Sequence, residues 1–249
     1  MMKPCSVFIG FDPREASAYL VARKSMTSRM SIPLPVYPLM LSQLRRDGLY
    51  NRPTERRDGR LYDVISDAPM ATEFAISRFL TVHLARRYAG KDRDYTKQAG
   101  WALFMDCDML ILGNVCRLFE QADDSKALMV VKHDHVPATS IKMDGQQQTG
   151  YARKNWSSVM MFNLDHPAND RLTVDLVNTA RGLHLHQFCW LPEDDIGELP
   201  IEWNWLAGYS NNTIAPQIVH HTDGVPFMPG YENAPYAEQW RRELERALQ

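Results

Sequence analysis

The sequence has 249 residues, of which 45% are hydrophobic, enough to bury one large core or two small ones. A formal net charge of −2 gives no electrostatic reason to expect nucleic acid or an anionic membrane as the main partner. The four cysteines lack C-x-x-C spacing, and the sequence contains neither a signal peptide nor a long apolar span. We therefore expect a cytoplasmic protein with reduced thiols that is not an integral membrane protein.

The first predicted element is a short apolar strand over residues 6–11, followed at once by a helix that runs to about residue 30. Asp12 can cap this helix, Pro13 can occupy its first position, and Glu15 can complete a capping box. A strand, a sharp turn and a helix open many nucleotide-binding α/β sheets, whose ligands lie beyond the carboxyl ends of the strands. Asp12 thus has two compatible roles, as the N-cap and as a contact to a base or ribose.

Two segments of unusual composition come next. Residues 32–41 contain three prolines, which remove hydrogen-bond donors, so this stretch is predicted to be an edge strand or an extended connection. Residues 45–67 are polar, rich in arginine and without apolar periodicity, which indicates a long loop. Such a loop can be a mobile lid or an acceptor-binding segment, or it can be a solvated excursion without a role.

A helix is predicted from Thr72, its N-cap, to about Gly90. Arg78 lies on this helix, directly ahead of the next strand. This order can bring its guanidinium close to Asp106 or to a bound phosphate, which a planar fork suits well. The alternative is an exposed helical arginine with no such role.

The central motif is the apolar run 101–112, which follows Gly100 and is broken by Asp106 and Asp108. It is predicted to be a buried strand that carries two acids at its end. Side chains two positions apart in an extended chain share a face, so the two carboxylates can bind one cation. Hard oxygen ligands favour Mg²⁺ or Mn²⁺, which suits diphosphate chemistry. A solvated turn after the strand is the alternative.

The next predicted elements are a helix over 114–122, a buried strand over 127–132, a strand over 154–163 and an amphipathic helix over 169–181. The strand predicted over 154–163 begins with polar residues. Asn155 and Ser157 among these residues can meet a polyhydroxylated ligand, or they can simply cap the start of the strand.

The last part of the sequence combines acids, indoles and imidazoles. Asp194 and Asp195 belong to a run of three acids, which is costly unless the acids are solvated or used. Trp203 and Trp205 can stack on a sugar or close the core. The final strand, over 217–224, carries His220, a candidate third metal ligand that would favour Mn²⁺ over Ca²⁺ without excluding Mg²⁺. A charged amphipathic helix is predicted over 235–248.

Taken together, these segments resemble the sugar-nucleotide glycosyltransferases of the GT-A type. The likeness is closest to retaining family 8, which includes glycogenin and bacterial lipooligosaccharide galactosyltransferases. It consists of the strand ending in Asp12, the Ser77-Arg78-Phe79 helix, the Phe104-Met105-Asp106-Cys107-Asp108 motif, the strand from Asn155 to Asn163, the run from Glu193 to Ile196, Trp203-Asn204 and His220. The resemblance implies an α/β fold with a Rossmann-like mixed sheet flanked by helices, in a single domain spanning residues 1–249.

The resemblance also implies a function. Asp106, Asp108 and His220 would hold Mn²⁺ or Mg²⁺, Arg78 would contact the nucleotide diphosphate, and Asp12 would lie near the base. The protein would transfer a sugar from a nucleotide diphosphate sugar, usually a UDP-sugar, to an unknown glycan, lipid or protein acceptor. The family's outcome is retention of the anomeric configuration.

The sequence departs from the family at two positions. The family's Lys-Pro-Trp after the histidine appears as Val225-Pro226-Phe227, so the phosphate-binding lysine is absent. Asp194 stands where the family has a glutamine beside the reacting sugar. With Asp195 it is expected in the catalytic centre, one carboxylate stabilising charge at the anomeric carbon and the other contacting the donor sugar.

Two functions other than transfer stay open. One is a non-catalytic module that binds nucleotide sugars, which the missing lysine favours. The other is a sugar-nucleotide nucleotidyltransferase. That enzyme class has a glycine-rich basic loop after the first strand, a loop that this sequence does not contain.

Overall fold

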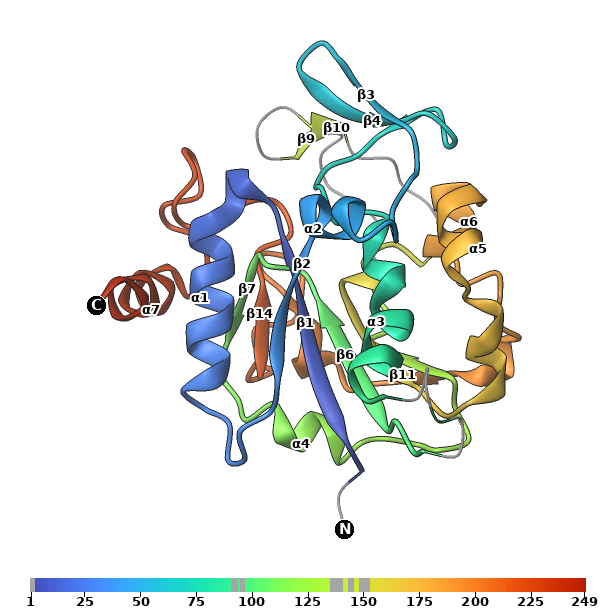
Figure 1. Ribbon diagram of the computed structural model, residues 1–249. Helices are drawn as coiled ribbons and strands as arrows, with labels where there is room; N and C mark the ends of the chain where they lie inside the picture. Colours follow the sequence, from blue (N-terminus) through green and yellow to red (C-terminus); the bar gives the residue numbers. More distant parts are fainter. Residues whose placement is uncertain (1–2, 91–93, 95–96, 135–140, 143–145, 148–152) are drawn as a thin grey trace.

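The computed structural model describes residues 3–90, 94, 97–134, 141–142, 146–147 and 153–249. Its centre is a six-stranded mixed sheet with the strand order β12-β8-β11-β6-β1-β2 (Figure 1). The strands of this sheet are β1 (Cys5–Phe11), β2 (Val36–Met40), β6 (Trp101–Met105), β8 (Leu128–Val130), β11 (Val159–Asn163) and β12 (Ile196–Glu198). β1 is parallel to β2 and β6, β12 is parallel to β8, and β11 runs antiparallel between β6 and β8. This is the mixed α/β architecture that the sequence predicts.

Smaller sheets flank the large one. β13 (Trp205–Leu206), β14 (Ile218–His220) and β7 (Met109–Ile111) form a three-stranded sheet. A second three-stranded sheet consists of β3 (Thr54–Arg57), β4 (Arg60–Asp63) and β5 (Ala68–Pro69), and β9 (Ile141–Lys142) pairs with β10 (Gln146–Gln147). Because β7 follows β6 after a short bend, its antiparallel pairing with β14 brings the end of β14 next to the end of β6.

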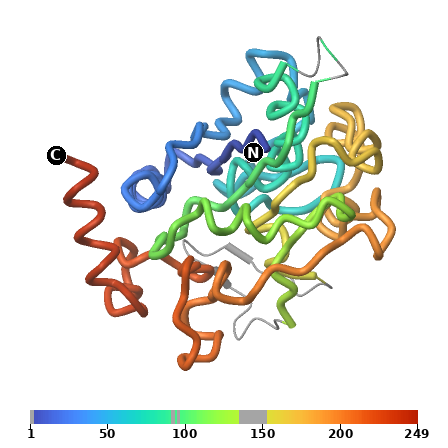
Figure 2. Tube along the Cα trace, turned by 90° about the horizontal axis from the view of Figure 1, so that it is seen from below, coloured from blue at the N-terminus to red at the C-terminus, as the bar shows by residue number. Residues whose placement is uncertain are grey.

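Helices pack around these sheets. The α-helices are α1 (Ala16–Thr27), α2 (Leu41–Arg46), α3 (Thr81–Tyr88), α4 (Cys116–Phe119), α5 (Val174–Thr179), α6 (Gly182–His186) and α7 (Ala237–Leu248). The 3₁₀ segments named below are η1 (Pro13–Glu15), η2 (Ser77–Leu80), η4 (Trp156–Ser158), η5 (Pro167–Arg171), η6 (Glu193–Asp195) and η7 (Ile201–Asn204). α1 packs against β1 and β7, α3 packs against β6, and α7 lies alongside α1 (Figures 1 and 2).

Three inner strands of the large sheet, β6, β8 and β11, are buried over their whole length. Every residue of β6 and of β11 is buried, so both strands read as uninterrupted apolar runs rather than as alternating patterns. The proline-containing strand β2 lies at one edge of the sheet, as predicted, where a missing backbone donor costs least. Trp203 and Trp205 are 4% and 2% exposed and close the core, so sugar stacking by these indoles is excluded in this structure.

The first helix begins as predicted but without a capping box. The Asp12 side chain accepts a hydrogen bond from the backbone N–H of Arg14 at 2.9 Å, and Pro13 opens η1, which continues into α1. The Glu15 side chain points inward instead of back to the N-cap. It accepts a hydrogen bond from Cys107 Sγ at 3.1 Å, so burial beside Cys107 replaces the predicted capping interaction.

The helix predicted from Thr72 starts later. Residues 71–76 form bends and turns, η2 follows, and α3 begins only at Thr81. It ends at Tyr88, two residues before Gly90, whose φ is +76°. Thr72 is not an N-cap, because its hydroxyl makes no hydrogen bond within the described part of the chain. The turns place the Phe74 ring against Gly10, where a Cβ would approach the ring to 2.6 Å. Burial of this ring therefore prevails over an early helix start.

The segment 45–67 is folded, so the prediction of a long loop is wrong. Arg57 pairs with Arg60 across a two-residue turn formed by Asp58 and Gly59, whose φ angles are 50° and 78°. These positive angles are typical of the turns that match the twist of a β-hairpin. The hairpin β3–β4 extends from the molecule above the carboxyl ends of β1 and β6 (Figure 1).

A buried ion pair anchors this hairpin. Arg52 is 0% exposed, and its Nε and Nη2 donate to the carboxylate of Asp63 at 2.5 and 2.7 Å. Its Nη1 donates to the carbonyls of Val177 and Ala180 at the end of α5. A buried arginine, rather than a set of apolar side chains, therefore anchors the hairpin. This explains why the segment 45–67 has no apolar periodicity.

Other predicted boundaries differ in detail. The helix expected over 169–181 is divided into η5 and α5, because Thr173 starts a new helix by accepting from the N–H of Leu176 at 3.0 Å. The helix expected over 114–122 is reduced to α4. All four cysteines are free, as expected. None of the helices in the described ranges has the length and apolarity that a membrane span requires.

Candidate metal and donor site

Three side chains predicted as metal ligands meet at the carboxyl ends of the strands. Asp106 and Asp108 lie in the bend between β6 and β7, and His220 ends β14 opposite Met109. One ligand atom from each of the three lies within 4.8 Å of the others. His220 Nε2 is 3.4 Å from Asp108 Oδ1. The structure thus brings together residues that are more than 100 positions apart in the sequence.

The protonation of His220 fits a cation site. Its Nδ1 is 3.0 Å from Oδ1 of Asn204, and an amide oxygen only accepts, so Nδ1 carries the proton. In the neutral ring, Nε2 then carries the lone pair. It makes no hydrogen bond within the described residues, although the ring is only 1% exposed. A lone pair next to two carboxylates is unfavourable unless a cation lies between them, so the cluster is compatible with a divalent metal ion.

Arg78 is buried beside this cluster. Its Nη1 is 2.8 Å from Asp106 Oδ1 and donates to the carbonyl of Ser157 at 2.8 Å. Its guanidinium carbon lies 5.4 and 5.1 Å from the ring centres of Phe74 and Phe104. The predicted approach of Arg78 to Asp106 is confirmed, and the alternative of an exposed helical arginine is wrong.

Asp12 is fully engaged by the protein. Oδ1 accepts from the N–H and Nε of Arg14 at 2.9 and 3.1 Å, and Oδ2 accepts from Arg14 Nη2 and from the N–H of Glu73 at 2.7 and 3.0 Å. Burial acts to raise the pKa of Asp12, but the hydrogen bonds from Arg14 and Glu73 hold it below its usual value. The side chain is 0% exposed, and the structure shows it as the N-cap of η1. A contact of Asp12 to a base or ribose stays a prediction.

The polar turn before β11 is held by its own hydrogen bonds. Asn155 has a φ of 65°, and its carbonyl accepts from the hydroxyl of Ser158 at 2.6 Å and from Nδ2 of Asn204 at 3.3 Å. Ser157 Oγ lies 2.8 Å from Nδ1 of His186. Burial and the charge of Arg78 lower the pKa of His186 to about 3, so this ring is neutral and serves as a structural partner.

Several buried polar atoms at this edge have no hydrogen-bond partner within the described part of the chain. They are Thr72 Oγ1, Ser77 Oγ, Asn155 Nδ2, His220 Nε2 and Thr222 Oγ1. Each belongs to a segment that adjoins Asp12, Arg78 or the metal cluster. Buried polar atoms are normally satisfied, so their concentration here indicates a site for a polar ligand.

The acids predicted to be catalytic lie at the opposite end of the sheet. Ile196 is level with Leu128, Leu128 with Phe162, and Phe162 with Ala102 near the start of β6. Asp195 precedes Ile196, and its carbonyl accepts from the N–H of Ala127, whereas Asp106 follows the other end of β6. The expectation that Asp194 and Asp195 line the donor cleft is therefore wrong. The acidic run forms η6, which leads directly into the start of β12.

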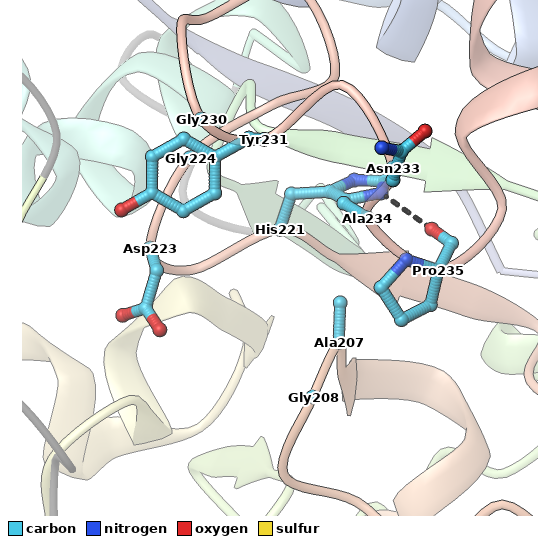
Figure 3. Close-up of a pocket in the computed structure, with 10 residues that line it drawn as sticks. All are labelled: Ala207, Gly208, His221, Asp223, Gly224, Gly230, Tyr231, Asn233, Ala234 and Pro235. Atoms are coloured by element: carbon cyan, nitrogen blue, oxygen red, sulfur yellow. Dashed lines mark hydrogen bonds between the residues drawn. The ribbon is translucent and has the colours of Figure 1, made fainter.

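The segment after His220 borders a pocket of about 300 Å³ (Figure 3). The backbone N–H of His221 donates to the carbonyl of Asp108 at 2.9 Å, and His221 Nε2 lies 2.9 Å from the carbonyl of Pro235. Further along, Val225 stands at the family's lysine position and supplies no ammonium group. Its side chain is 2% exposed, whereas Phe227 is 66% exposed.

Three side chains that support this site are not predicted from the sequence. The resemblance includes Asn204 without a role, the capping-box pattern assigns Glu15 to a helix cap, and no motif includes His186. Each acts through a hydrogen bond to a residue far away in the chain. Such contacts leave no local pattern, so only the structure could show them.

Comparison with known proteins identifies the fold and a close relative. No family model matches the chain. Protein CDI of Arabidopsis thaliana is 42% identical over 248 residues, which cover 98% of this chain and 87% of that protein. This value is high enough to establish common descent.

Similar solved structures include the bifunctional glycosyltransferase WbbM (TM-score 0.55, 15% identity) and the glycosyltransferase GlyE of Streptococcus pneumoniae TIGR4 (TM-score 0.57, 15% identity). Both matches cover 98% of this chain, which spans only 52% and 60% of those two chains. The galactosyltransferase LgtC in complex with donor and acceptor sugar analogs has a TM-score of 0.54 at 14% identity, and the match covers 97% of this chain and 95% of LgtC. These likenesses confirm the predicted GT-A fold.

Proposed function

We propose that this chain, which belongs to the family of Protein CDI from Arabidopsis thaliana, is a metal-dependent glycosyltransferase that uses a nucleotide diphosphate sugar. The observation that carries the proposal is the cluster of Asp106, Asp108 and His220 at the carboxyl edge of a GT-A sheet. Ligands of open α/β sheets bind at this edge, and mixed oxygen and nitrogen donors suit Mn²⁺ or Mg²⁺. The solved complex of LgtC with donor and acceptor sugar analogs supports the same reading.

The residues of the site have separate roles in this proposal. Asp106, Asp108 and His220 would hold the ion, which when bound supplies positive charge for the departing diphosphate. Arg78 fixes the position of Asp106 and places a cation next to the diphosphate, where its planar donors fit phosphate oxygens. The amide of Asn155 and the backbone around Ser157 lie beside the donor sugar, and the unpartnered Asn155 Nδ2 is available to a hydroxyl group.

The proposal also covers substrates and organisation. UDP-sugar is the proposed donor, and a glycan, lipid or protein is the acceptor. The proposal includes one domain over residues 1–249, which is supported by the cluster of buried residues that runs from Val7 to Trp240 in the described part of the chain. Four free thiols support a reducing compartment such as the cytoplasm.

A second candidate is a non-catalytic module that binds nucleotide sugars. It is favoured by Val225-Pro226-Phe227 in place of the phosphate-binding lysine and by the distance of Asp194 and Asp195 from the metal cluster. A nucleotidyltransferase is disfavoured, because β1 leads through Asp12 and Pro13 into a helix without a glycine-rich basic loop.

A screen of nucleotide sugars with and without Mn²⁺ separates these candidates. A transferase is expected to show Mn²⁺-dependent thermal stabilisation by one donor and slow release of its nucleoside diphosphate. A binding module would show the stabilisation without the release. If no nucleotide sugar raises the melting temperature in the presence of Mn²⁺, both candidates are wrong. Where transfer is found, the configuration of the sugar in the product decides between retention, which we propose, and inversion.

A further inference from the structure

Asn204 lies directly behind the metal cluster and is 0% exposed. It ends η7, and the next residue, Trp205, pairs in parallel with Val219. This register brings the Asn204 side chain next to His220, whose Nδ1 is 3.0 Å from Asn204 Oδ1. The amide is thus the nearest hydrogen-bond partner of a proposed metal ligand.

The orientation of this amide is fixed by its other contacts. Asn204 Nδ2 donates to Ser158 Oγ at 2.9 Å and to the carbonyl of Asn155 at 3.3 Å. The Ser158 hydroxyl is itself a donor to the carbonyl of Asn155 at 2.6 Å, so its oxygen can only accept from Asn204. A flipped amide would place its oxygen against a carbonyl oxygen, so Oδ1 must face His220.

We propose that Asn204 is a positioning residue that selects the His220 tautomer with the proton on Nδ1, and that it thereby sets the affinity of the cluster for a divalent cation. The inference rests on the proposed metal site. Without this acceptor, the proton would move to Nε2, which lies 3.4 Å from Asp108 Oδ1. Nε2–H would then donate to that carboxylate and close the site to a cation. Asn204 prevents this closure and keeps the Nε2 lone pair available to a cation.

The same network reaches the donor side of the site. The carbonyl of Asn155 accepts from both Asn204 and Ser158, and these bonds hold Asn155 at its φ of 65°. The left-handed conformation costs free energy in a residue other than glycine, so it persists only with such support. Asn204 therefore positions a metal ligand and the proposed donor contact Asn155 together.

Mn²⁺ binding to the free protein, measured by electron paramagnetic resonance without nucleotide, tests the inference. Asn204→Ala is expected to weaken Mn²⁺ binding 10- to 100-fold, as loss of such partners of ligating histidines does. Asn204→Asp keeps an acceptor for Nδ1–H, so it is expected to bind Mn²⁺ more tightly than Asn204→Ala, although both lose the bonds to Ser158 and Asn155. Asn169→Ala is the matched control, because Asn169 is also 0% exposed and donates to two backbone carbonyls, at 2.7 and 2.9 Å. This control is expected to bind Mn²⁺ like the wild type.

Nitrogen-15 spectra of the histidine side chains in the metal-free wild type provide a readout that does not depend on any variant. His220 is expected to carry its proton on Nδ1, and in Asn204→Ala the proton is expected to shift to Nε2. A wild-type His220 protonated on Nε2, or equal Mn²⁺ affinities for wild type and Asn204→Ala, would overturn the inference and leave the proposed function intact. Failure of the wild type to bind Mn²⁺ would overturn both.

Discussion

Arg78 holds Asp106 and the carbonyl of Ser157 with one planar group. Arg78→Lys replaces this group by a compact ammonium that cannot keep both contacts and also reach a phosphate. We expect UDP affinity in the presence of Mn²⁺ to fall about tenfold or more, corresponding to about 1.4 kcal/mol, measured by titration calorimetry.

Arg57→Lys is the control for this substitution. Arg57 pairs with Glu55 and Asp67 on the exposed hairpin, and exposed pairs of this kind contribute little. Equal UDP affinities for the two variants would remove Arg78 from the donor site.

Glu15 gives a prediction about pH. Burial, reinforced by the charge of Asp108, raises the pKa of Glu15 to about 7 from its ordinary value of 4.5. The folded protein therefore holds this proton more tightly than the unfolded chain, and the free energy of unfolding should fall as the pH rises from about 4.5 to 7. Glu15→Gln removes this decrease. At pH 8 the free energy of unfolding of the metal-free variant should exceed that of the wild type by up to about 3 kcal/mol, and at pH 4.5 the two values should be similar.

Urea unfolding of the metal-free protein at the two pH values checks this prediction. A difference between Glu15→Gln and wild type that is the same at both pH values would show that Glu15 does not titrate as described.

The roles of single residues differ in how well the sequence predicts them. Asp106 and Asp108 could be identified because their spacing and the apolar run before them are local patterns. The sequence predicts Asp12 correctly as a cap, but the hydrogen bond that it accepts from Glu73 comes from a residue 61 positions later in the chain. Motifs formed by neighbouring residues can thus be predicted from the sequence, whereas hydrogen-bond partners that are distant in the sequence cannot.

The hairpin β3–β4 depends on a buried charge rather than on apolar packing. Asp63→Asn leaves Arg52 buried without a counter-charge, which costs about 3 to 5 kcal/mol in comparable pairs. We expect a loss of about 3 kcal/mol in the free energy of unfolding, measured by urea denaturation. Asp67→Asn breaks only the exposed contact to Arg57 and should cost less than about 1 kcal/mol. Similar losses in both variants would mean that the buried pair does not anchor the hairpin.

The same hairpin shows why one element was missed. Asp58-Gly59 is a strong turn signal, but the flanking residues are arginines rather than alternating apolar residues. The stabilising partner of Arg52 includes carbonyl groups of α5, more than 120 positions later in the chain. The apolar strands β1, β6 and β11 all lie within predicted segments, because each consists of buried apolar residues, but only β1 matches its predicted bounds closely. The segment 101–112 divides into β6 and β7, and β11 begins only after η4.

For the whole molecule, the mixed sheet decides which predicted residues can cooperate. β6 and β1 deliver their ends to one edge, and the pairing of β14 with β7 adds His220 to the same place. β11 is antiparallel to both β6 and β8, so β8 and its parallel neighbour β12 run in the same direction as β6. The acidic run precedes β12 and therefore lies at the opposite edge. Strand order and direction are set by long-range pairing, so the sequence could propose a GT-A fold but could not assign Asp194 and Asp195 to the correct end of the sheet.

The central claim is that Asp106, Asp108 and His220 hold a divalent ion for glycosyl transfer. Its most direct test is the rate of nucleoside diphosphate release from the donor found in the screen, with Mn²⁺ and with a chelator. We expect release that requires Mn²⁺, falls at least about 100-fold in Asp108→Ala and is unchanged in Asp194→Asn, whose carboxylate lies at the opposite edge. Release at the wild-type rate in the chelator, or in Asp108→Ala with Mn²⁺, would contradict the claim.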